Sequence, residues 1–250
     1  MRLALLIEYD GTNFSGWQFQ PEERTVQGEL ENAFRRITSS DVTVFGAGRT
    51  DTGVHAEGMV AHVDIDLELP PLSRLIEGLN ATSGFDVVVK DIREVSQEFH
   101  ARFSALSRSY RFDIIRTRSA LHRQFALEVR QQLDLAAMQQ AASLLLGDHD
   151  FTSFSKRSED VTHYRCIVSR SEWVEDGEFL RYHLAANRFV RGMVRATVGL
   201  LIEVGKGNLS VARFEELLNT AEETDRARYV VAPCGLYLEK IVYAEEFGLW

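Results

Sequence analysis

The sequence predicts an α+β protein in which one order of elements, β-α-β-β-α-β, occurs twice. Some segments alternate apolar and polar residues, which is typical of half-buried strands, whereas others repeat apolar residues at helical spacing. The two kinds of segment follow one another in the same order in both halves of the chain. This order alone predicts the architecture, since no sequence repeat accompanies it.

In the first half, the apolar runs predict three kinds of segment: strands, helices and one loop that contains glycine and proline. They are a strand over residues 2–9, a helix through Val26, Leu30, Phe34 and Ile37, strands over 41–45 and 58–67, a helix over 72–79 opened by Pro70 and Pro71, and a strand over 86–95.

The second half repeats this order with one extra helix. Asp176-Gly177 is a strong hairpin signal between two alternating runs. The expected elements are a half-buried strand over 109–116 with Tyr110, Phe112 and Ile114 on one side, a helix with Asp134 as N-cap and Gly147 at its end, strands over 166–176 and 178–187, a helix over 189–204, a short acidic helix, and a strand over 235–245.

Two ferredoxin-like (RRM-like) halves with mostly antiparallel sheets are therefore expected, over residues 1–103 and 104–250. Each such half leaves one sheet face open unless another element covers it. Two sheets joined around a central cleft would form a trough in which a long polymer could lie.

Composition excludes several classes of protein. Two cysteines, Cys166 and Cys234, form no CxxC pair and fit a reducing cytoplasm. Glu8 and Asp10 interrupt the first apolar run, so we expect no export signal, and no run is long enough for a membrane span. The net charge of −9 argues mildly against bulk nucleic-acid binding, although arginines cluster at 102–123 and 188–195.

The segment "VFGAGRTDTGVHA", residues 44–56, places Arg49 and Asp51 two residues apart between glycines. Its spacing matches neither the P-loop nor the dinucleotide-binding fingerprint, and a strand is expected to follow it. Taken alone, the segment fits a tight turn between two strands with Arg49 and Asp51 paired at the surface.

The segment "GRTDTGVHA", residues 48–56, resembles the catalytic motif of the tRNA pseudouridine synthase A family. Further segments resemble that family in the same order along nearly the whole chain: "EYDGTNFSGWQFQ", "TVQGELENAF", "FHARFSALSRSYRF", "LLLGDHDFTSF", "NRFVRGMVR" and "GLYL". The family has a duplicated ferredoxin-like fold, in agreement with the expected element order. The chain departs from it at Ala196, where asparagine is common, and after Asn80.

The resemblance implies conversion of uridine to pseudouridine in the tRNA anticodon arm, at positions thirty-eight to forty, by a homodimer that needs no cofactor. Asp51 would be the catalytic carboxylate, Arg195 its cationic partner, and Tyr110 the residue that stacks on the flipped uracil and moves a proton. Arg49 would hold the extruded nucleotide. The remaining expected substrate contacts are Thr50, His55, Arg188, Arg191 and Leu236. Arg188, Arg191 and Arg195 are spaced i, i+3 and i+7, so we expect them to share one helix face, with Arg188 and Arg191 binding phosphates.

Three alternatives accompany this prediction. His55 and His62 could suggest a metal site, but no third ligand accompanies them, so we expect structural or substrate-edge roles. A non-catalytic RNA-binding protein of the same fold would use the aromatic residues only for binding. A glycosidase would need a second placed carboxylate, for which the sequence offers no comparable glycine-framed position.

Overall fold

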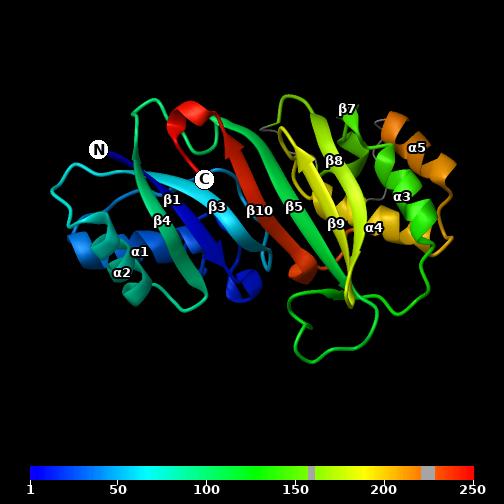
Figure 1. The fold of residues 1–250 in the computed structure, drawn as a ribbon, viewed down its shortest axis with the longest axis horizontal. Coiled ribbons are helices and arrows are strands. Elements are labelled where there is room, and N and C mark those ends of the chain that lie inside the picture. The colour runs from blue at the N-terminus through cyan, green and yellow to red at the C-terminus, as the bar shows by residue number, and fades with distance from the viewer. Residues whose placement is uncertain (157–160, 221–228) are drawn as a thin grey trace. The chain divides into compact units, whose positions relative to one another are not determined.

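The computed structural model describes residues 1–156, 161–220 and 229–250 (Figure 1). The chain divides into two compact units, one formed by Met1–Leu106 with Tyr237–Trp250 and the other by Ser107–Leu236. Both units combine mostly antiparallel strands with helices, which confirms the predicted α+β class. The chain passes from the first unit to the second after Leu106, close to the expected boundary at residue 103. Residues 237–250, however, cluster with the first unit, whereas the sequence assigned them to the second half.

In the first unit, the strands lie side by side in the order β4-β1-β3-β10. Strand β1 is antiparallel to both β3 and β4, whereas β10 runs parallel to β3 from the pair Tyr237–His55. A short strand, β2, pairs with the other end of β3. The strands are β1 (Arg2–Tyr9), β2 (Phe45–Gly46), β3 (His55–Asp64), β4 (Val87–Val95) and β10 (Leu236–Tyr243).

Helices α1 (Val26–Thr38) and α2 (Leu72–Thr82) lie on one face of this sheet (Figure 1). The predicted apolar stripe of α1 is confirmed, since Val26, Leu30 and Phe34 are fully buried. The Thr25 side chain accepts a hydrogen bond from the Gly28 amide and so caps the helix. Helix α2 begins directly after Pro71, as the two prolines predict.

Residues 96–104 and the last residues of the chain pack together within the first unit. Phe99 makes edge-to-face contacts with Tyr243 and Phe247. The Trp250 indole nitrogen donates to Asp91 of β4 at 2.6 Å, and Arg93 donates to the Gly248 carbonyl at 2.6 Å. The C-terminal residues are thus part of the structure of the first unit.

The second unit contains an antiparallel sheet in the order β5-β9-β8-β7, with the two-residue strand β6 parallel to β5. The predicted hairpin is confirmed: β8 and β9 are joined by a turn in which Gly177 has φ of +61°. The strands are β5 (Ala105–Ile115), β6 (Leu127–Glu128), β7 (Gly147–Asp150), β8 (Arg165–Asp176) and β9 (Phe179–Ala186).

Three helices complete the second unit: α3 (Leu135–Ser143), α4 (Met193–Gly205) and α5 (Val211–Thr220). The predicted cap of α3 is confirmed, because Asp134 accepts a hydrogen bond from the Ala137 amide at 3.0 Å. Part of the acidic stretch after α5 lies outside the described residues. Short 3₁₀ turns occur at Gly11–Asn13, Thr152–Phe154, Pro233–Gly235 and Glu245–Phe247.

Three predicted elements differ from the structure. Only Phe45 of the expected strand 41–45 is in a strand, because the amide of buried Val44 donates to the Glu31 side chain instead of to a neighbouring strand. Helix α3 ends at Ser143, and Gly147 begins β7 with φ of +102°. Strand β5 buries Asp113 as well as Phe112 and Ile114, since Arg111 donates to its carboxylate at 2.8 Å.

Within the described ranges, no helix combines the length and the apolar character needed to cross a bilayer.

His62 of β3 makes stability depend on pH. Burial lowers the pKa of His62 to about 4, and the neighbouring His100 and Arg2 add to the shift. The unfolded chain therefore takes up a proton near its ordinary pKa of about 6.5, whereas the folded protein does not. Acidification from pH 7.5 to pH 5 should therefore lower the free energy of unfolding by about 2 kcal/mol through His62 alone.

The variant His62→Asn tests this assignment. Asparagine can still accept the hydrogen bond that the Ala101 amide donates to His62 Nδ1, but it does not titrate. Urea unfolding at both pH values should show a smaller loss of stability on acidification, by about 2 kcal/mol, in the variant. An equal loss in the two proteins would refute the assignment.

Candidate functional site

Residues 47–54 of the glycine-containing segment form a loop between β2 and β3 of the first unit, so the strand expected after the segment is confirmed. The Ala47 amide donates to the Val60 carbonyl at 2.8 Å, which closes one end of the loop. A turn closes the other end, where the Val54 amide donates to the Asp51 carbonyl at 3.2 Å. Between these ends, Arg49 is exposed, Thr50 is buried and Asp51 is half-buried.

Residues 11–17, here called the bracing segment, hold this loop by hydrogen bonds to its backbone. The Trp17 amide donates to the Thr50 carbonyl at 3.1 Å, and the Gly53 amide donates to the Phe14 carbonyl at 3.3 Å. These bonds lie on either side of Asp51 in the sequence. They fix the backbone that carries the carboxylate while the side chain keeps access to solvent.

Two glycines allow the bracing segment and the loop to approach closely. Gly16 has φ of +94°, and a Cβ atom placed there would lie 2.7 Å from the Thr50 carbonyl oxygen. A Cβ atom on Gly46 would lie 2.5 Å from the indole ring of Trp17. Gly48, by contrast, has no atom within 4 Å of such a Cβ. The glycines at 16 and 46 thus serve packing within the protein.

A side-chain hydrogen bond also reaches the loop from the sheet. The hydroxyl groups of Tyr9, the last residue of β1, and of Thr50 lie 2.8 Å apart. Tyr9 is 3% exposed and Thr50 is 7% exposed. The predicted substrate contact of Thr50 therefore concerns a side chain that is already bonded inside the protein.

His55 follows the loop as the first residue of β3 and is 2% exposed. Its ring stacks on Tyr237 with centroids 4.8 Å apart, and its Nδ1 accepts a hydrogen bond from the Gly11 amide at 3.1 Å. Its Nδ1 also lies 3.1 Å from a carboxylate oxygen of Asp10. The buried ring supports the backbone of the bracing segment.

His55 and His62 are therefore both built into the packing of β3. The His62 ring stacks on Phe45 at 5.0 Å, and its Nδ1 accepts from the Ala101 amide. Across the described residues, no three His, Cys, Asp or Glu side chains converge as metal ligands.

Tyr110 and Leu236 occupy different settings in the second unit. Tyr110 is half-buried on β5 opposite Leu184, and its ring meets Phe189 edge-to-face with centroids 4.9 Å apart. Sequence reasoning missed Phe189 as a neighbour of Tyr110, although it lies within the "NRFVRGMVR" segment. Leu236 is 4% exposed at the start of β10.

The expectation that Arg188, Arg191 and Arg195 share one helix face is wrong. Helix α4 begins at Met193, because Gly192 has φ of +75° and cannot continue a right-handed helix. Arg188 lies before the helix with its guanidinium 3.1 Å from His163, and Arg191 is exposed in the turn.

Arg195 alone of these three lies on α4. It is half-buried, and its Nε donates to the Val231 carbonyl at 2.8 Å. This bond fixes one side of the guanidinium in the second unit.

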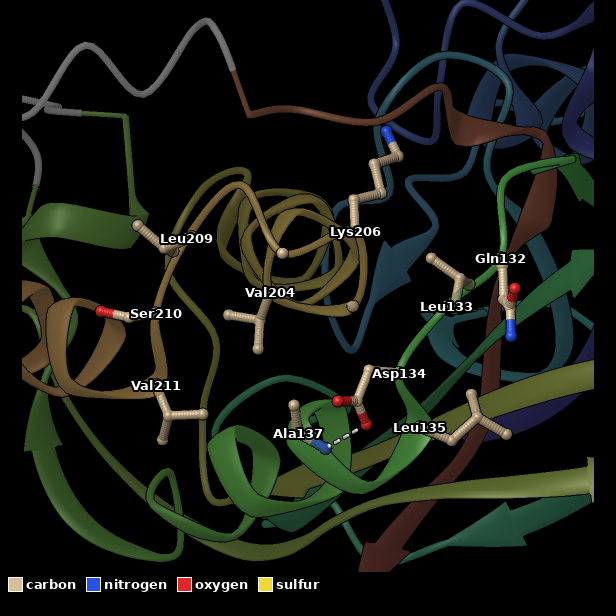
Figure 2. Close-up of a pocket in the computed structure, with 12 residues that line it drawn as sticks. Gln132, Leu133, Asp134, Leu135, Ala137, Val204, Lys206, Leu209, Ser210 and Val211 are labelled. Atoms are coloured by element: carbon tan, nitrogen blue, oxygen red, sulfur yellow. Dashed lines mark hydrogen bonds between the residues drawn. The ribbon is translucent and has the colours of Figure 1, made fainter.

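A hollow of about 900 Å³ lies between α3, α4 and α5 of the second unit (Figure 2). It contains none of the predicted site residues. Its charged side chains have partners within the unit, since Asp134 caps α3 and Lys206 pairs with Glu203 at 2.9 Å. The hollow therefore adds no candidate residue to the site.

The close approach of Gly16 and Thr50 generates a stability prediction. Gly16→Ala should lower the free energy of unfolding by about 2 kcal/mol or more, because the new Cβ meets a backbone oxygen in a left-handed conformation. Gly48→Ala, two residues from Thr50, should change it by no more than about 0.5 kcal/mol. Urea unfolding measures both, and equal values would contradict the packing described here.

Comparison with known proteins supports the resemblance seen in the sequence. The tRNA pseudouridine synthase family model matches residues 5–104 and 141–244. A tRNA pseudouridine synthase A from Chromobacterium violaceum is 43% identical over 252 aligned residues, which cover 100% of this chain and 95% of that protein. The protein of the same name from Chlorobium luteolum is 40% identical over 247 residues, 98% of this chain and 97% of its own. The predicted resemblance is confirmed, and the chain belongs to the tRNA pseudouridine synthase family.

Proposed function

We propose that this member of the family isomerises uridine to pseudouridine in the anticodon arm of tRNA, at positions thirty-eight, thirty-nine and forty, with Asp51 as the catalytic carboxylate. The observation that carries the proposal is the setting of Asp51. It is a half-buried residue of a loop whose backbone is bonded on both sides to the bracing segment, two residues after exposed Arg49. Rigid placement of a reacting group is a main source of enzymatic rate.

The isomerisation detaches uracil from C1′ through N1 and rejoins it through C5. It changes no oxidation state, so the balance of the reaction needs no redox partner. While the base is detached, a carboxylate can stabilise or attack the electron-poor centre, as the carboxylates of glycosidases do at an anomeric carbon. The half-buried Asp51 meets the requirement that such a group be held by the protein and yet reach the substrate.

The target uridine must leave the base stack before it can meet this carboxylate, at a cost of a few kcal/mol. Arg49 is exposed two residues before Asp51, on the same braced loop. Its guanidinium can occupy the vacated space or bind the adjacent phosphate through charge-assisted hydrogen bonds. We assign Arg49 to the extruded nucleotide for this reason.

Residues of the second unit take the roles that the family resemblance implies. Tyr110 would stack on the extruded uracil and move a proton, and the Phe189 contact orients its ring. Arg195 would keep the catalytic carboxylate ionised. Exposed Arg191 and half-buried Arg188 would bind phosphates, and Leu236 would form part of the pocket wall.

Phosphate binding by a few arginines would account for RNA recognition by a protein with a net charge of −9. We extend the proposal to a cytoplasmic homodimer that acts on tRNA, as the resemblance implies.

Asp51→Asn keeps the size of the side chain and removes its charge, so it should abolish pseudouridine formation while tRNA still binds. Tritium release from 5-tritiated uridine in unmodified tRNA measures turnover, and filter binding measures affinity. We expect turnover to fall by at least about 1,000-fold and Kd to change by less than about threefold. Substantial turnover in the variant would refute the role of Asp51.

Tyr110→Phe separates stacking from proton transfer. The ring and its contact with Phe189 remain, so tRNA affinity should be unchanged, whereas loss of the hydroxyl should lower turnover by about 100-fold or more. Single-turnover tritium release at saturating enzyme gives the rate directly. A variant with the wild-type rate would exclude the proton role and leave only the stacking role.

A further inference from the structure

The hydrogen bond between Tyr9 and Thr50 links β1, which is paired with both β3 and β4, to the residue before Asp51. We propose that Tyr9 is a positioning residue for the reaction, which acts through Thr50 to fix the direction of the Asp51 side chain. This inference rests on the proposed catalytic role of Asp51. Tyr9 lies on β1, outside the "GRTDTGVHA" segment, so the rigidity of the catalytic loop would come in part from the sheet.

The sheet fixes the backbone from which the Tyr9 ring extends. Tyr9 pairs with Ala56 of β3 on one side and with Val87 of β4 on the other. The register of β1 against β3 shifts between Ile7 and Tyr9, which is an irregularity at the last residue of the strand. The ring packs near Trp17 with centroids 6.2 Å apart. The tyrosine hydroxyl is therefore placed by a strand that is paired on both edges.

Thr50 is held through two of its atoms. Its carbonyl accepts from the Trp17 amide at 3.1 Å, and its side-chain oxygen bonds to the Tyr9 hydroxyl at 2.8 Å. One attachment would leave the residue free to turn about the bonded atom. Two attachments in different directions remove that freedom, and because Asp51 is the next residue, they also limit the directions open to its carboxylate.

Burial makes this link sensitive to substitution. Tyr9 and Thr50 are almost fully buried, so water cannot easily replace a lost partner. Removal of the Tyr9 hydroxyl takes away this partner of the Thr50 oxygen, and we expect the Thr50 side chain to turn toward another one. A displacement of about 1 Å at a reacting group can cost about 100-fold in rate. The inference therefore predicts an effect on turnover rather than on tRNA affinity.

The test compares Tyr9→Phe with Tyr243→Phe. Tyr243 is the matched control, because its hydroxyl is also buried in the first unit and donates to the Ala101 carbonyl at 2.7 Å, at the other end of β10 from Tyr237. Tyr9→Phe should lower kcat for tritium release by about 10- to 100-fold and change KM for tRNA less than twofold. Tyr243→Phe should lower Tm to a similar extent and keep the wild-type kcat.

Thr50 supplies the second arm of the test. Thr50→Ser keeps the hydroxyl and should retain at least about half of kcat, whereas Thr50→Val should lose as much as Tyr9→Phe. The double variant Tyr9→Phe/Thr50→Val should be no slower than the slower single variant, because both substitutions break one link. A wild-type kcat in Tyr9→Phe, or losses in the double variant that multiply, would overturn the inference.

Asp51→Asn, measured in the same assay, distinguishes the two proposals. If Asp51→Asn is inactive and Tyr9→Phe is normal, only the positioning role of Tyr9 fails. If Asp51→Asn is active, the catalytic role of Asp51 fails, and the inference about Tyr9 fails with it.

Discussion

The hydrogen bond from the Trp17 amide to the Thr50 carbonyl is the constraint on which the site in the first unit depends. It joins a loop that carries an exposed arginine and a half-buried aspartate to a segment that is packed into the core through Phe14 and Trp17, each 2% exposed. The bond requires a backbone approach that only glycine permits at position 16. These contacts fix the backbone of the loop that carries Arg49 and Asp51.

The two histidines of β3 bind neighbouring segments of the chain through the same kind of hydrogen bond. Each uses Nδ1 to accept a hydrogen bond from the backbone amide of a neighbouring irregular segment, Gly11 for His55 and Ala101 for His62. For His62, the lowered pKa agrees with a neutral imidazole that accepts at this nitrogen. In both cases a histidine side chain provides the acceptor for a backbone amide in a segment outside the strands.

The sequence predicted those elements whose signals are local. The stripe of α1, the cap at Asp134 and the hairpin at Gly177 all depend on residues within one turn or one hairpin, and the structure confirms them. The family motif predicted the loop that carries Asp51, but not the segment that holds it. The bonds from residues 11–17 join positions more than thirty residues apart, and no spacing rule reports such contacts.

The failed predictions have long-range or conformational causes. Val44 sits in a strand-like run, yet its amide is bonded to Glu31, a side chain on α1. The helical spacing of Arg188, Arg191 and Arg195 was real in the sequence, but one left-handed residue, Gly192, separates the first two from the helix. Phe189 escaped notice as a neighbour of Tyr110 because a single loop aromatic has no periodicity to detect.

The membership of residues 237–250 in the first unit has a consequence for synthesis on the ribosome. Strand β10 pairs with the start of β3, but it is translated only after the whole of the second unit, on the order of ten seconds later at about 5–20 residues per second. Until then, the start of β3 at His55 and Ala56 lacks this partner strand and stays open to pairing with other chains. A premature stop codon anywhere in residues 107–236 would leave that part of β3 permanently without β10.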